Sequence, residues 1–198
     1  MLDPEILVYY STKFARLRVD RAHGIAPHKP ILLLSVIEHI KQGLITQNQI
    51  YLSEELIATF IKVWSYLGSE HHYADISRPF FHLRGDKFWH LIPNRGYRKI
   101  ITSKVKLKTF AEVKQAVKYV QMDDALFELL QAPLSRASLT TILVQKWFSH
   151  KLDQYNQLLE ATSYAECQDP FSKDSEQYRL NEKRPELLHQ AVYATSDR

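Results

Sequence analysis

The stretch GIAPHKPILLLSVIEHI, residues 24–40, joins a stiff charged turn directly to an apolar helix. Pro27 and Pro30 enclose His28 and Lys29, and proline suits the first turn of a helix. The run of leucine and isoleucine that follows is typical of a helix buried on most of its sides. We therefore expect a central helix that begins near Pro27 or Pro30 and presents His28 and Lys29 at its start.

Helical periodicity on both sides of this stretch predicts a mainly helical chain. We expect further helices over residues 4–18, 53–66, 110–120, 123–130 and 134–148. In PFFHLRGDKFWHLI, residues 79–92, aromatic residues alternate around RGDK, which predicts a hairpin with His82 facing His90. GYRKIITS, residues 96–103, is a candidate third strand. The predicted class is α+β, mainly helical, with helices packed around a small antiparallel sheet or aromatic hairpin.

Composition and charge favour a globular protein with a polyanionic partner. The 198 residues are 45% hydrophobic, and the single cysteine, Cys167, excludes a disulfide framework. We find no signal peptide and no membrane span, so we expect a soluble cytoplasmic protein. The net charge is +4, but residues 87–111 carry seven basic residues and no acidic one. Such a patch suits nucleic acid better than a membrane, with an ordinary solvated surface as the plain alternative.

The common catalytic patterns are missing from the sequence. Nine histidines are present, but none has the spacing of a metal site, and no phosphate-binding glycine loop occurs. Cys167 lies in a polar, acidic stretch without a basic neighbour, and Asp86 is explained by turn chemistry. We therefore assign no catalytic residue, no metal and no cofactor, and expect the chain to bind rather than to cut.

Four blocks of the sequence carry a family resemblance. They are RVDRAHGIAPHKPILLLSVIEHI, SEELIATFIKVW, RPFFHLRGDKFWHL and ITSKVKLKTFAEVKQAVKYVQMDDALFELLQAP, in this order between residues 18 and 133. Together they resemble the sulfur-binding domain of bacterial type IV restriction enzymes. That family recognises DNA in which a non-bridging phosphate oxygen is replaced by sulfur, a phosphorothioate. The resemblance covers about residues 10–150 and implies that the partner is double-stranded phosphorothioate DNA.

The resemblance also implies roles for particular residues. Pro79 packs its ring on the sulfur, and Arg78 and His82 line the same cup. His28 and Lys29 contact the modified phosphate, and Ser103 and Lys104 form a second donor position. Candidates for base or backbone contacts are His71, His72, Tyr73, Asn94, Arg95, Arg98, Lys99 and Lys106. The family often has an aromatic residue in place of Arg78 and a small one in place of His82, so this cup is more polar.

The sequence predicts a division near residue 150. Residues 1–150 form the sulfur-binding domain, and residues 151–198 form a polar, acidic linker or extension with a short final helix over residues 185–195. In the family such an extension leads toward an HNH nuclease domain, which this chain does not include. The oligomeric state is open, with a dimer as one option.

Three other functions remain open at this point. A winged-helix type of DNA-binding domain would combine helices, an aromatic hairpin and a basic patch without any preference for sulfur. A protein-interaction module would use the same patch to bind an acidic partner. An enzyme is the third, with its catalytic residues outside this chain.

Overall fold

The structure is a computed structural model of the chain, and it describes residues 4–102, 107 and 109–168. Its helices are α1 (Pro4–Ala15), α2 (His28–Lys41), α3 (Glu54–Leu67), α4 (Ser77–His82), α5 (Arg98–Thr102), α6 (Phe110–Ala116), α7 (Asp124–Gln131), α8 (Pro133–Trp147) and α9 (Leu152–Gln168). Two 3-10 helices, η1 (Leu83–Asp86) and η2 (Ser149–Lys151), and two strands, β1 (Trp89–Pro93) and β2 (Val117–Met122), complete the described elements. The fold is mainly helical with a small antiparallel sheet, as predicted.

The chain divides into two units, residues 1–158 and residues 159–198. The first unit contains every element from α1 to η2 and the beginning of α9, whereas the second is described only for the last part of α9. Across the described residues, no helix is both long and apolar enough to cross a membrane.

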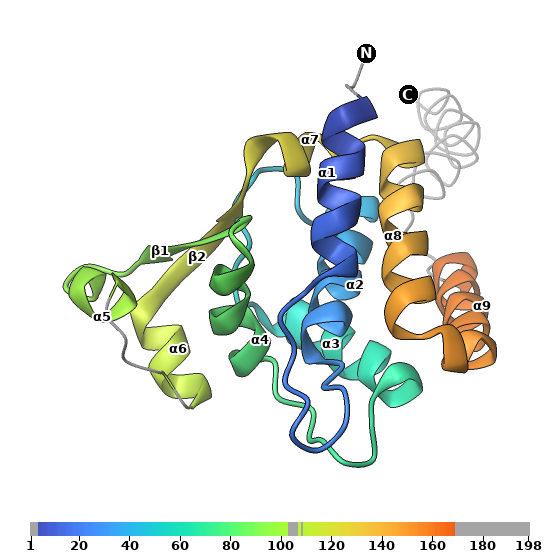
Figure 1. Ribbon diagram of the computed structural model, residues 1–198, viewed down its shortest axis with the longest axis horizontal. Coiled ribbons are helices and arrows are strands. Elements are labelled where there is room, and N and C mark those ends of the chain that lie inside the picture. Colours follow the sequence, from blue (N-terminus) through green and yellow to red (C-terminus); the bar gives the residue numbers. More distant parts are fainter. Residues whose placement is uncertain (1–3, 103–106, 108, 169–198) are drawn as a thin grey trace, which may run out of the picture. The chain divides into compact units, whose positions relative to one another are not determined.

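Helix α2 forms the centre of the first unit, as Figure 1 shows. It packs against α3, α4, α7 and α8, and Ile31, Leu32 and Leu33 are fully buried. Burial on nearly all sides explains why this helix carries apolar residues around its whole circumference. The predicted central helix is therefore confirmed, and it begins at His28, one residue after Pro27.

The two strands form one antiparallel pair that projects from the helices and carries α5 and α6 near its far end (Figure 1). Trp89 pairs with Met122, and the register runs on to Pro93 with one irregularity after Ile92. Ile50 extends the pairing, because its backbone exchanges two 2.8 Å hydrogen bonds with Val120. The sheet thus joins segments that are about 30 or more residues apart in the chain.

The predicted hairpin over residues 79–92 is wrong. Its first half is the end of α4 followed by η1, and only its second half is a strand, whose partner is β2. Pro79 lies in the first turn of α4, where the missing backbone N–H of proline leaves no helical hydrogen bond unmade. The indole N–H of Trp89 donates a 2.8 Å hydrogen bond to the carbonyl of Phe80. The aromatic residues of this stretch therefore stabilise the packing of α4 against β1. They do not form the wing that a winged-helix domain would have.

Other predictions are also corrected. His82 and His90 do not face each other, because His82 ends α4 and His90 binds Asp123 from β1. Residues 98–102 form α5 rather than a strand, and the helix expected over residues 110–120 ends at Ala116, where the chain enters β2. Residues 152–168, which lie in the predicted linker or extension, form α9, and the role of this segment stays a prediction. The helix expected over residues 185–195 lies outside the described residues.

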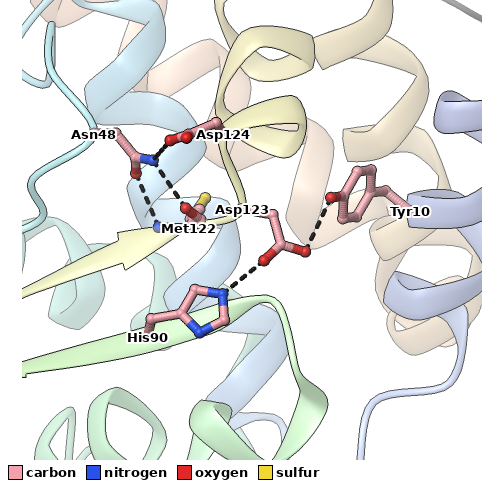
Figure 2. A network of polar contacts seen from close by, with 6 residues as sticks. All are labelled: Tyr10, Asn48, His90, Met122, Asp123 and Asp124. Atoms are coloured by element: carbon pink, nitrogen blue, oxygen red, sulfur yellow. Dashed lines mark hydrogen bonds and ion pairs between the residues drawn. The ribbon is translucent and has the colours of Figure 1, made fainter.

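A polar network fastens the end of β2 to its surroundings (Figure 2). The carboxylate of Asp123 accepts from the Tyr10 hydroxyl at 2.9 Å and lies 2.6 Å from Nε2 of His90. Burial raises the pKa of Tyr10, and the neighbouring Asp123 carboxylate raises it further. The hydroxyl of Tyr10 therefore keeps its proton and remains a donor. Asn48 completes the network with two 2.8 Å hydrogen bonds to the backbone of Met122. These contacts join α1, β1 and the loop between α2 and α3 to the same turn.

The buried His39 makes stability depend on pH. Its side chain lies in α2 and its Nε2 is 2.8 Å from the hydroxyl of Thr59. Burial lowers the pKa of His39, outweighing the carboxylates of Glu38 and Glu55. A lowered pKa means that the unfolded chain takes up a proton before the folded chain does. The contribution of His39 to the free energy of unfolding is therefore complete above about pH 6.5, and it is lost as the pH falls below that value.

We expect His39→Gln to reduce the loss of unfolding free energy between pH 7.5 and pH 5. The native protein should lose up to about 1.4 kcal/mol more per pH unit than the variant, measured by urea denaturation. His150→Gln is the control, because His150 is exposed. Equal pH dependence in native and His39→Gln proteins would contradict the interpretation.

Candidate nucleic-acid interface

A pocket of about 710 Å³ lies where three segments of the first unit meet. The segment between α1 and α2, the start of α2, and the α4–η1 region form most of its wall. Its lining residues are Arg18, Val19, Asp20, Ala26, His28, Lys29, His72, Arg78, Pro79, His82, Gly85 and Leu107. The sequence-predicted residues His28, Lys29, Arg78, Pro79 and His82 are thus brought together around one pocket.

A buried ion pair holds this wall together. Nζ of Lys29 lies 2.6 Å from Oδ2 of Asp86, and both side chains are almost completely buried. The other carboxylate oxygen, Oδ1, accepts the backbone N–H of Arg18 at 2.8 Å. Asp86 therefore joins all three segments of the wall, and its assignment to turn chemistry is wrong. Its partner is 57 residues away in the sequence, so no local pattern indicates the pair.

His28 is half-buried and held in one orientation. Its ring lies 4.6 Å from the Trp64 ring and 5.6 Å from the His72 ring, measured between centroids. Nε2 is 2.9 Å from the carbonyl oxygen of Tyr73, which can only accept, so Nε2 carries the hydrogen. Burial lowers the pKa of His28. The imidazole is therefore an oriented wall of the pocket, and burial disfavours its charged form.

Helix α4 supplies the apolar part of the pocket together with a cation. Pro79 is buried but lines the pocket, and His82 is half-buried beside it. The Arg78 side chain is 71% exposed and lies 3.3 Å from a carboxylate oxygen of Asp75. Both Lys29 and Arg78 are thus paired with carboxylates. The pocket combines a proline ring with charges that are already partly balanced.

The remaining candidates lie in several places. His72 lines the pocket, whereas His71 lies outside it and Tyr73 is 92% exposed. Asn94 is used structurally, because its amide donates to the carbonyl of Gln115 at 2.9 Å. Arg95, Arg98 and Lys99 are exposed in and before α5, apart from the pocket wall. Ser103, Lys104 and Lys106 lie outside the described residues. The DNA-binding roles of all these residues stay predictions.

The sequence analysis missed two charged residues of the pocket, Arg18 and Asp20. Both follow α1 in the segment RVD, where neither a helical period nor a turn motif distinguishes them from ordinary surface charges. Only the approach of this segment to η1, through the N–H of Arg18, brings them to the pocket. Within the described part of the chain, no group of three or more histidine, cysteine, aspartate or glutamate residues could hold a metal ion.

The buried pair predicts strong coupling between Lys29 and Asp86. Lys29→Met or Asp86→Asn alone should each destabilise the fold by about 3 kcal/mol, since each leaves a buried charge unpaired. The double variant should lose less free energy of unfolding than the sum of the two single variants, with a difference of about 1 kcal/mol or more measured by urea denaturation. The exposed Lys41–Glu38 pair is the matched control, with an expected coupling below about 0.5 kcal/mol. Additive losses at Lys29 and Asp86 would contradict the interpretation.

Comparison with known proteins now adds to this geometry. Residues 10–166 match the family described as ScoMcrA-like, DNA sulfur-binding domain. The chain is similar to the solved structure titled "Sulfur binding domain of ScoMcrA complexed with phosphorothioated DNA", with a TM-score of 0.52 and 19% identity, over 76% of this chain and 98% of that chain. At this identity the likeness concerns the fold, and no curated protein matches the sequence. Because the family match spans most of its length, the chain belongs to the ScoMcrA-like DNA sulfur-binding domains.

Proposed function

We propose that this chain binds double-stranded DNA at the pocket and prefers a backbone phosphate in which sulfur replaces one non-bridging oxygen. The observation that carries the proposal is the position of Pro79, whose ring lines a pocket that also contains Lys29 and Arg78. A phosphorothioate keeps its negative charge but exposes a larger, more polarisable atom that hydrogen-bonds poorly. It therefore needs an apolar surface for the sulfur and donors for the remaining oxygen.

The paired charges of the pocket favour such selectivity. Asp86 and Asp75 partly balance Lys29 and Arg78, so the pocket attracts an ordinary phosphate less than free cations would. An oxygen placed against Pro79 loses its water and finds no donor there, which costs free energy. A sulfur atom at the same place loses much less hydration free energy, because it binds water weakly. Discrimination then comes from desolvation rather than from net charge.

Arg78 occupies the place where the family often has an aromatic ring. Its guanidinium is planar and can lie flat against a base or sugar while it donates to the remaining phosphate oxygen. His82 fills the side of the cup with a polar ring. These two residues supply donors around the proline ring, which suits a phosphate with one sulfur and one oxygen.

The wider setting follows the family resemblance. We propose that reading the modified backbone serves a type IV, modification-dependent restriction system in the bacterial cytoplasm, and that an HNH nuclease domain outside this chain performs any cleavage. Binding itself requires no cofactor in this account, because the pocket offers its own donors and its own apolar surface.

The direct test compares two duplexes that differ only in one Rp phosphorothioate per strand, in several flanking sequences at near-physiological salt. The native protein should bind the sulfur duplex more tightly in at least one context. Pro79→Ala removes two ring carbons, at about 0.8 kcal/mol each, and should weaken sulfur-duplex binding roughly tenfold while affecting the oxygen duplex less. Binding is measured by fluorescence anisotropy.

Pro133→Ala is the matched control, because Pro133 begins α8 and does not line this pocket. It should leave both affinities unchanged. Equal affinity of the native protein for the two duplexes in every context would leave a general DNA-binding domain. No binding of either duplex would favour the protein-interaction module.

A further inference from the structure

A second hollow of about 740 Å³ lies beside the first pocket. Its floor includes the buried side chains of Trp147 and Phe148, at the end of α8. Its rim includes the exposed residues Arg21, His71 and Lys146. None of these residues lines the first pocket. Among them, the sequence analysis named only His71 as a candidate for DNA contact.

The two hollows share a dividing ridge. The segment between α1 and α2 supplies Arg18 and Asp20 to the first pocket and Arg21 and Ile25 to the second. The loop after α3 likewise gives one histidine to each hollow. Because the same two segments contribute to both, the two hollows are adjacent.

This ridge is ordered by hydrogen bonds. The N–H of Ala26 donates to the carbonyl of Asp20 at 2.9 Å, and the N–H of Ala22 donates to its carboxylate at 2.9 Å. On the other side, the ammonium of Lys151 donates to the carbonyl of Gly68 and joins η2 to the end of α3. Both walls of the second hollow are therefore formed before any ligand arrives, which lowers the ordering cost of binding.

The second hollow, like the first, is lined by more basic than acidic residues. Arg21, Lys146 and Lys151 line it together with one acidic residue, Glu70, so its formal charge is +2 with neutral histidines. Among the residues that the structure describes, neither Arg21 nor Lys146 forms an ion pair with a carboxylate. Unpaired cations attract any phosphate, whether modified or not.

We propose that the second hollow binds unmodified backbone phosphates that flank the modified one on the same duplex. This inference rests on the proposed function of the first pocket, and three observations favour DNA over an acidic protein partner. The hollow is next to the pocket, Arg21 and Lys146 form no ion pair within the described part of the chain, and its walls are ordered. It supplies affinity that is independent of sulfur and sequence, while the first pocket supplies the selectivity.

The test uses Arg21→Gln, Lys146→Gln and the double variant, titrated with the sulfur and oxygen duplexes over a range of salt concentrations. Each single variant should weaken binding of both duplexes by the same factor. The double variant should reduce the slope of log affinity against log salt by about 1.8, because each phosphate contact contributes about 0.9. The ratio of sulfur to oxygen affinity should stay at the native value.

Two features of the design separate charge from structural damage. Lys146 lies on α8, outside the ridge, so its variant removes a charge without touching the loop that both hollows share. Lys41→Gln is the matched control, because Lys41 ends α2, about 20 Å from His28 by the rise of 1.5 Å per residue, and it should change neither affinity nor slope.

Native affinity and native salt slope in the double variant would overturn the inference, while a native preference for sulfur would leave the proposed function standing. A changed sulfur-to-oxygen ratio in the double variant would also overturn it, because the hollow would then shape the sulfur pocket itself. If the native protein binds neither duplex, both the inference and the proposed function fail.

Discussion

The ion pair between Lys29 and Asp86 is the contact on which the rest of the candidate interface depends. It is buried, it measures 2.6 Å, and its carboxylate also binds the backbone of Arg18. A buried charge pair is costly to separate, so these contacts hold the start of α2, the preceding loop and η1 in one arrangement. Pro27 and Pro30 stiffen the same turn. The pocket wall is consequently set by the fold rather than assembled when DNA arrives.

This arrangement gives the two neighbouring hollows different electrostatic properties. In the first pocket, carboxylates pair with Lys29 and Arg78, two of its three basic residues, and the ring of Pro79 lines the wall. In the second hollow, Arg21 and Lys146 form no ion pair with a carboxylate of the described residues. A reader of backbone chemistry needs both properties, because strong net charge in the sulfur pocket would hold ordinary phosphates as well. The positions of the carboxylates are the basis of the proposed separation of affinity from selectivity.

The helices that the sequence predicted well are those with a clear local signal. The apolar run after Pro30 indicates α2, and Ser53 caps α3 through the N–H of Leu56, as its position before two glutamates suggests. The prediction of a hairpin over residues 79–92 was wrong because closely spaced aromatic residues are compatible both with the alternation of a strand and with the end of a helix. Strand β2 was missed because its partner, β1, lies about 30 residues earlier, and pairing at that distance leaves no local pattern.

The site shows the same limit. The residues His28, Arg78, Pro79 and His82 were named through a family resemblance, and the structure brings them to one pocket. The pairing of Lys29 with Asp86, 57 residues away, could be found only in three dimensions. The same holds for the approach of Arg21 to Lys146, which lie at the two ends of the first unit's sequence.

The most direct measurement of the central claim is a crystal structure of the chain bound to a phosphorothioate duplex, with the sulfur located by its anomalous scattering. The account predicts a sulfur peak against the ring of Pro79, inside the pocket bordered by His28 and His82, with the Lys29–Asp86 pair intact. A sulfur peak facing solvent, or DNA bound away from this pocket, would contradict the account.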